Sequence, residues 1–261
     1  MDSRTMILGI TGVCLYSSLT LAGESGIQSM SAPVLRPMVA LLGGYANINA
    51  GDSLVGVGTD DDVFTYKNSG GKNSGFIGAF LGVEYQLPVP QPGFFLQGGL
   101  EYDYFWPINV SGINTVGIEP DTSTLYAYHY RFQTQQVLVA ARLLGTVYDR
   151  FHPYAAAGIG AAFNDASRYT AITDETGSIN LTPQFSGHSQ SQFTYNLGLG
   201  IDTDINQHLR LGVGYRYSGF GNASLGTGDV VFGDYQAAVP FALGTNNAYA
   251  NQFIAQLSYV Y

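Results

Sequence analysis

Apolar and polar residues alternate with a period of two over much of this chain, a pattern typical of β-strands that have two different faces. In the clearest segment, every second residue is apolar and the residues between, apart from Phe80, are small or polar. The apolar set is Ile77, Ala79, Leu81, Val83 and Tyr85, and the opposite set is Gly78, Phe80, Gly82, Glu84 and Gln86. We predict eight strands, near residues 37–49, 77–86, 94–106, 133–148, 154–163, 193–202, 209–217 and 250–261.

The lengths of these segments favour a membrane protein. A tilted transmembrane strand needs about 9 to 11 residues, whereas strands of globular proteins average about 5 or 6. The connections alternate between short turns (87–93, 149–152, 206–208) and long polar loops (50–74, 107–127, 164–192, 218–249). This sorting is typical of outer-membrane barrels. The predicted fold is therefore all-β: a closed eight-stranded antiparallel transmembrane β-barrel with long extracellular loops and short periplasmic turns.

The beginning of the chain has the pattern of a secretory signal peptide. The run from Met6 to Ala22 carries no charge and ends in Thr20-Leu21-Ala22, and Cys14, the only cysteine, lies within it. A retained membrane anchor is the alternative, although the run is short for a span. We expect a signal peptide over residues 1–22, a periplasmic linker over 23–36 and the barrel domain over 37–261.

The large apolar face of each strand is expected to contact lipid, with the tyrosines near the strand ends forming aromatic girdles. The alternative is a soluble sandwich in which the apolar faces form the core. The polar faces would then line a lumen that side chains can fill in a barrel of this size. Its charged candidates are Glu84, Glu101, Asp103, Arg142, Asp202, Asp204, Arg210 and Arg216, with the amides Gln97, Asn196, Gln252 and Gln256.

Buried charges must be paired and hydrogen-bonded, so these candidates are expected to form a polar network that plugs the barrel. A second interpretation is a gated, narrow ion pathway, because the glycines on the same face would leave space for water. Nucleic-acid binding is excluded by the net charge of −9 and the absence of a basic patch.

No cofactor or metal site is expected. The four histidines share no metal-ligand spacing, and Asp60-Asp61-Asp62 matches no calcium-loop pattern. A lipid-modifying enzyme would need a serine, a histidine and an acid together near the outer rim. His188-Ser189 has no partner at a recognisable spacing, so we do not expect an enzyme.

Three stretches resemble the small eight-stranded outer-membrane barrels of Gram-negative bacteria, of the OmpA type and the opacity-protein type. They are residues 152–163, the hairpin at 195–218, and the final QFIAQLSYVY. In that family an alternating C-terminal ending is read by the barrel-assembly machinery, which implies an assembly signal at Phe253, Leu257, Tyr259 and Tyr261. The terminal Tyr261 departs from the commoner Phe. No peptidoglycan-binding domain follows the last predicted strand, so a wall-anchoring role is not implied.

Together these observations predict a non-catalytic outer-membrane surface protein that supports envelope integrity and presents loops for adhesion or host interaction. The alternative is a narrow pore or conduit for small or hydrophobic solutes. Expected partners are outer-membrane lipid and lipopolysaccharide, the barrel-assembly machinery, and host or surface ligands of the loops. We expect a monomer without cofactors.

Overall fold

The computed structural model describes residues 35–50, 54–57, 63–88, 93–117, 124–172, 182–232 and 234–261, all within one compact unit that spans 33–261. The expected signal peptide lies outside these residues, as does nearly all of the expected linker. Among the described residues, no helix is long and apolar enough to cross a membrane. The strands are β1 (Leu35–Asn49), β2 (Leu54–Val57), β3 (Val63–Asn68), β4 (Lys72–Gln86), β5 (Phe94–Phe105), β6 (Ile108–Val116), β7 (Thr124–Gly145), β8 (Phe151–Ile172), β9 (Gln184–Phe185), β10 (His188–Asp204), β11 (Leu209–Phe232) and β12 (Tyr235–Val260).

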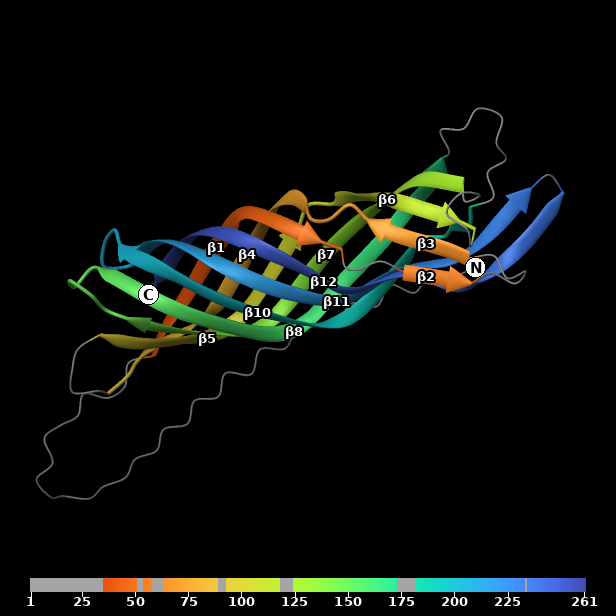
Figure 1. Ribbon diagram of the computed structural model, residues 1–261. Helices are drawn as coiled ribbons and strands as arrows, with labels where there is room; N and C mark the ends of the chain where they lie inside the picture. The colour runs from red at the N-terminus through yellow and green to blue at the C-terminus, as the bar shows by residue number, and fades with distance from the viewer. Residues whose placement is uncertain are drawn as a thin grey trace, which may run out of the picture. The chain divides into compact units, whose positions relative to one another are not determined.

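Eight of these strands form an antiparallel ring (Figure 1). Their order is β7-β5-β4-β1-β12-β11-β10-β8, and the pairing of β7 with β8 completes the ring. A ring leaves no free sheet edge, so backbone groups inside a membrane find hydrogen-bond partners without water. The predicted all-β, eight-stranded antiparallel barrel is confirmed, and each predicted strand lies within one strand of the ring, apart from short overhangs at a few ends.

The four segments predicted as long polar loops contain more β-structure than expected. The strands continue far beyond their predicted ends, so that β11 has 24 residues and β12 has 26. The segment 50–74 contains β2 and β3, and 107–127 contains β6 with the start of β7. The end of β8, β9 and the start of β10 occupy much of 164–192, and β11 and β12 occupy nearly all of 218–249. Their glycine- and asparagine-rich composition hid the alternation. We call this region the β-extension, and the opposite end of the ring the turn end.

The outward and inward faces of the ring strands differ as the alternation predicted. Outward side chains are large, apolar and exposed, for example Leu81 at 65% and Leu199 at 67% of their surface. Their inward neighbours, such as Phe80, Glu84 and Leu138, are buried. The outward band is suited to lipid, and the core of the molecule lies inside the ring.

A belt of hydrogen bonds between outward tyrosines and amides marks where this apolar band stops. Tyr102 donates to Gln135 Oε1 over 2.8 Å, and Gln133 donates to the hydroxyl of Tyr104 over 3.1 Å. Two further pairs complete the belt: Tyr45 with Asn73 and Tyr215 with Asn251. Aromatic residues of this kind gather at membrane–water interfaces. We call these eight residues the tyrosine–amide belt.

The distance from the belt to the turn end fits one crossing of a bilayer. From Ile77 to Tyr85, nine residues, the outward positions of β4 are all apolar, and a transmembrane strand needs about 9 to 11 residues. The β-extension therefore lies beyond the membrane.

The β-extension has its own aromatic core. Tyr66 packs against Tyr128 and Phe185, with ring centroids 5.6 and 5.9 Å apart, and Tyr169 packs edge-to-face on Phe185 at 5.1 Å. Burial raises the pKa of the Tyr128 hydroxyl to about 12, further above physiological pH than that of an exposed tyrosine. Aromatic pairs at such distances add to the stabilisation from burial. The segments predicted as loops are therefore held in a defined arrangement.

Leu81 and Leu125 offer a matched test of the membrane boundary, because both are outward and similarly exposed (65% and 57%). Leu81 lies midway along the lipid-facing part of β4, whereas Leu125 lies ten residues beyond the belt residue Gln135 on β7. We expect Leu81→Arg to lower the free energy of unfolding by about 2 to 4 kcal/mol and Leu125→Arg to change it little. Denaturant titration in lipid vesicles measures both, and equal losses would contradict the boundary.

Candidate functional site

The candidate site is the inside of the ring, where the strands place the predicted charged residues. The inward positions of β4, β5, β7, β10 and β11 carry all eight of them. Seven are buried, and Asp204 lies at the turn end with 30% of its side chain exposed. These residues form two groups of ion pairs and hydrogen bonds with the inward amides.

Arg216 is the centre of the first group. Its guanidinium donates to Glu101, to Asp103 Oδ2 over 2.8 Å and to Gln252 Oε1 over 2.8 Å. The ring of Phe76 lies 5.3 Å from its central carbon. Arginine has no acceptor and a rigid fork of donors, and here carboxylates from β5 and an amide from β12 use that fork.

Arg142 links this group to Asp202. It lies between the rings of Phe80 and Tyr154, at 5.4 and 5.5 Å from their centroids. Its guanidinium donates to Gln256, whose own amide donates to Asp202 Oδ1 over 2.7 Å. A longer contact of 3.4 Å joins it to Glu101. The charge is therefore surrounded by aromatic faces and polar partners from four strands.

A second group lies at the turn end. Arg210 donates to Glu84 and to Asp204 Oδ1 over 2.8 Å, and Arg36 approaches Glu84 at 3.4 Å. His152 bridges Asp204, at 2.9 Å, and the hydroxyl of Thr146, at 3.1 Å.

Sequence reasoning missed Arg36 and His152. The signal was present, because Arg36 has the strand parity of the inward Met38, and His152 has the parity of the inward Tyr154.

Several glycines of the inner face lie against side chains that occupy the space where the sequence suggested room for water. Side chains fill the positions where glycines have no Cβ. A Cβ on Gly200 or Gly214 would lie 2.5 Å from the hydroxyl of Tyr154, and Asp202 fills the position at Gly212 in the same way. The cavity that remains between Glu101, Arg142, Tyr154 and Arg216 has a volume of about 10 Å³, about one probe sphere for a single water.

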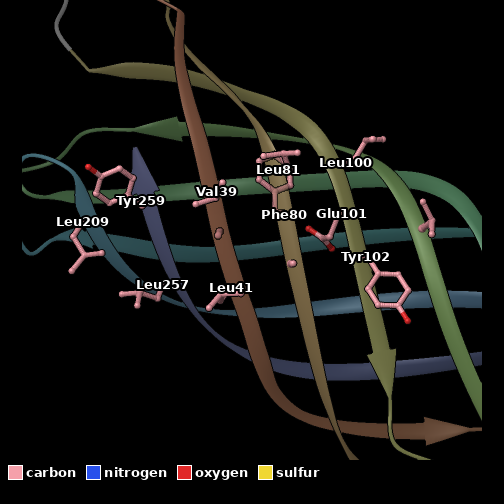
Figure 2. Close-up of a pocket in the computed structure, with 13 residues that line it drawn as sticks. Val39, Leu41, Phe80, Leu81, Leu100, Glu101, Tyr102, Leu209, Leu257 and Tyr259 are labelled. Carbon is pink, nitrogen blue, oxygen red and sulfur yellow. The ribbon is translucent and has the colours of Figure 1, made fainter. Parts of the chain in front are cut away.

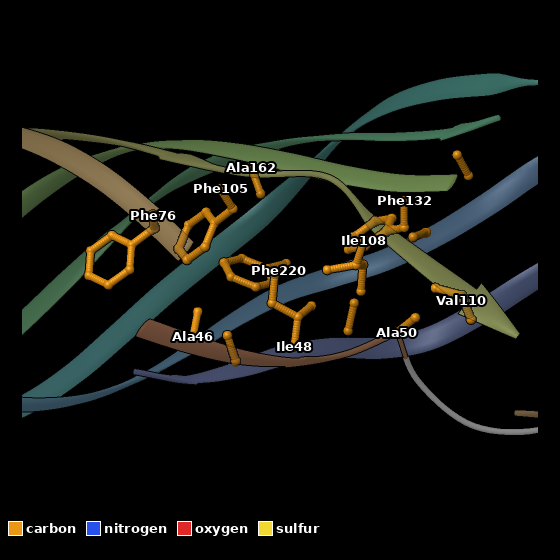
Figure 3. Packing of buried hydrophobic residues seen from close by; sticks show 14 of the residues in the cluster. Ala46, Ile48, Ala50, Phe76, Phe105, Ile108, Val110, Phe132, Ala162 and Phe220 are labelled. Atoms are coloured by element: carbon orange, nitrogen blue, oxygen red, sulfur yellow. The ribbon is translucent and has the colours of Figure 1, made fainter. Parts of the chain in front are cut away.

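An apolar layer lies beyond the ionic groups, on the way to the β-extension. Figure 3 shows the rings of Phe76, Phe105 and Phe220 close together, with Ile48 and Ile108 beside them. Phe76 stacks on Phe105 at 5.4 Å, and Phe105 meets Phe220 edge-on at 5.1 Å. All three phenylalanines are almost fully buried. Two successive layers, one ionic and one apolar, therefore fill the ring.

Two other features bear on metal binding and on catalysis. In the part of the chain that the structure describes, no three histidine, cysteine or acidic residues lie close enough to hold a metal ion. Ser189 donates to Asp165 Oδ2 over 2.6 Å, whereas His188 pairs with Ala166 in the sheet. Among the described residues, the three groups that a lipid-modifying enzyme would need are not joined by hydrogen bonds there.

An apolar depression lies on the outside of the ring, across β12, β1, β4 and β5 (Figure 2). Its volume is about 570 Å³. The outward side chains that line it are apolar, among them Val39, Leu41, Leu81, Leu100 and Leu257. Because it belongs to the lipid-facing band, it is a contact surface for acyl chains rather than a site for a polar solute.

The sequence model of a family described as outer membrane protein beta-barrel domain matches residues 29–260. The chain belongs to this family. Membership agrees with the eight-stranded ring and the apolar outward band. It assigns this domain to the outer membrane of Gram-negative bacteria. No curated protein matches the chain.

Solved outer-membrane structures have a similar fold at low sequence identity. Neisserial surface protein A is 12% identical, with 85% of this chain and 96% of that chain covered and a TM-score of 0.39. OprG from Pseudomonas aeruginosa is 13% identical, with 86% and 96% covered and a TM-score of 0.42. Ail of Yersinia pestis is 10% identical, with 86% and 99% covered and a TM-score of 0.33. These values describe a likeness of fold alone.

The four residues of the expected assembly signal lie at the end of the β-barrel domain. Phe253, Leu257 and Tyr259 point outward from β12, and Tyr261 follows the strand with 77% of its surface exposed. β12 pairs with both β1 and β11, so the first and last strands of the chain meet there.

Arg216 provides a direct test of whether the ionic layer is dry. Arg216→Ala leaves Glu101 and Asp103 without their shared partner, and we expect the free energy of unfolding to fall by about 3 to 5 kcal/mol. Arg150→Ala, in the exposed turn before β8, serves as the control and should change stability by less than about 0.5 kcal/mol. A near-neutral Arg216→Ala in denaturant titrations would mean that water solvates the lumen.

Proposed function

We propose that this β-barrel domain is a non-catalytic, non-conducting surface protein that supports the integrity of the outer membrane. In this proposal the turn end faces the periplasm and the β-extension projects outside the cell. The observation that carries the proposal is the filled ring, in which an ionic layer around Arg216 is followed by the apolar layer around Phe105. A solute would have to displace both.

The ionic layer opposes transport for energetic reasons. Separating a buried charge from its partners costs several kcal/mol, because no water replaces them. Arg142 and Arg216 share Glu101, and Arg210 shares Glu84 with Arg36. Movement of one side chain therefore leaves others unpaired, and the network favours one closed arrangement.

The β-extension supports a role in adhesion or host interaction. Its aromatic core holds the paired strands of the β-extension in a defined arrangement. The sequence of the connections between these strands is acidic and includes Asp60, Asp61, Asp62, Glu119 and Glu175. A ligand of the tips would therefore carry positive charge or bring divalent cations.

Conductance separates this proposal from the alternative of a narrow pore or conduit. We expect the wild-type protein to give no steady channels in planar bilayers and no uptake of small solutes into liposomes, because both layers seal the ring. A general porin reconstituted in parallel is the positive control. Steady channels or solute uptake by the wild-type protein would contradict the proposal and favour the conduit.

The proposal includes export with cleavage after Ala22, a linker over residues 23–36, and a monomer in the outer membrane. Gel mobility of the outer-membrane fraction in SDS, boiled against unboiled, tests the folded monomer, because a ring of hydrogen-bonded strands stays compact until heated. N-terminal sequencing of the same band tests the cleavage. A soluble periplasmic protein without a mobility shift would overturn the membrane assignment.

Recognition by the barrel-assembly machinery is proposed to depend on Phe253, Leu257, Tyr259 and Tyr261. We expect deletion of Tyr261 to reduce the amount of heat-modifiable protein in cells while leaving refolding in detergent nearly unchanged. The reason is that Tyr261 lies after the end of β12, where little of the sheet's hydrogen bonding depends on it. Tyr148→Ala, an exposed tyrosine in a turn, is the control. Equal losses in cells and in detergent would assign Tyr261 a structural role instead.

A further inference from the structure

Two outward arginines lie just beyond the tyrosine–amide belt, on the strand pair that completes the ring. Arg131 on β7 pairs with Ser167 on β8, and the adjacent outward pair toward the membrane is Gln133 with Asp165. Arg168 follows Ser167 directly and is exposed. Since Gln133 belongs to the belt, Arg131 is the first outward residue of β7 beyond it.

This position corresponds to the headgroup layer of a membrane. Two residues of strand span about 7 Å, and a strand tilt of about 40° reduces this to about 5 Å along the membrane normal. The polar layer on each side of a bilayer is about 5 to 7 Å thick. The guanidinium of Arg131 is therefore attached at the level of lipid headgroups.

A β-bulge brings Arg168 to the same place. The register between β7 and β8 shifts between His129 and Arg131, and Arg168 has a φ of 57°. Ala166 and Tyr169 are both buried, so the two residues between them, Ser167 and Arg168, face outward together. A bulge re-aims side chains in this way. Non-glycine residues rarely adopt a positive φ, and such positions cluster at functional sites.

The two arginines also differ from those of the lumen in their charge partners. Among the described residues, neither Arg131 nor Arg168 has an ion-pair partner, whereas Arg36, Arg142, Arg210 and Arg216 are all paired. The nearest acid along the sheet, Asp165, already accepts hydrogen bonds from Ser167 at 3.2 Å and Ser189 at 2.6 Å.

Further outward, the pair His129 and Thr170 adds an imidazole and a hydroxyl. On a chain with a net charge of −9, this is a local concentration of hydrogen-bond donors, and the two arginines have no ion-pair partner among the described residues.

We propose that Arg131 and Arg168, with His129 beside them, bind phosphate groups of the outer-leaflet glycolipid, lipopolysaccharide. The guanidinium fork matches two phosphate oxygens at once. Because the two arginines lie at the level of the lipid headgroups, a membrane lipid is favoured over a soluble polyanion. A soluble polyanion would contact the tips of the β-extension first. The inference rests on the proposed orientation, with the β-extension outside the cell, and assigns the expected lipopolysaccharide partner to named residues.

The test measures binding of purified lipopolysaccharide to the full-length protein in nanodiscs made without it. We expect Arg131→Gln/Arg168→Gln to weaken binding by at least about tenfold. The matched control is Arg150→Gln, an exposed arginine at the turn end, which should bind like the wild type. Unchanged affinity in the double variant would overturn the proposal.

The source of the phosphate is tested with the wild-type protein. We expect enzymatically dephosphorylated lipopolysaccharide to bind much more weakly, and inorganic phosphate at equal phosphate concentration not to compete. Equal binding of the dephosphorylated lipid would overturn the proposal. Full competition by inorganic phosphate, or tighter binding of a soluble sulfated polysaccharide, would assign the arginines to a free anion instead.

Arg168→Gly separates binding from folding. Glycine adopts a positive φ without strain, so we expect this variant to unfold at the same denaturant concentration as the wild type or a higher one, while its affinity for lipopolysaccharide falls. If the bulge serves only the fold, affinity will not change, and the proposal fails. The conductance assay remains independent: channels in the wild type would overturn the proposed function, whatever the lipid affinity.

Discussion

The structure depends on one constraint: inside a membrane, backbone N–H and C=O groups have no water to bind. The ring meets this constraint because β7 pairs with β8 and leaves no free edge. Outward side chains must then be apolar, so every charge on a membrane-crossing strand must face a lumen that is only wide enough for side chains. Ion pairing inside the ring follows from closure of the sheet.

The proposed sealing of the ring therefore depends on the same contacts that fill it. Arg142 and Arg216 are acceptable inside the ring only because Glu101, Asp103 and Gln256 take up their donors. The same contacts remove the space that water would need. The glycines complete this arrangement, because Gly200 and Gly214 provide the position that the Tyr154 ring occupies. A conducting lumen would need different residues at several of these positions at once.

The eight strands, their faces and the eight inward charges could be predicted, because strand parity is a local property of the sequence. The β-extension could not. Its core joins Tyr66 to Phe185 across 119 residues, and contacts over such separations leave no mark on local alternation. The glycines were misread for a related reason: a missing Cβ indicates space, and only the fold shows that Asp202 or Tyr154 from another position occupies it.

The two faces of each long strand pass through different environments along its length. On β7 the outward residues pass from apolar to the belt amide Gln133 and then to Arg131, while the inward ones pass from Arg142 to Phe132 and Tyr128. The register shifts among the described pairs, at His129/Arg131 and from Gly219 onward in β11, all lie beyond the belt. A bulge leaves backbone groups unpaired, which lipid does not tolerate but headgroups and water do. The strained Arg168 therefore lies at the first level where the membrane permits a bulge, which is also the first level where an outward charge is solvated.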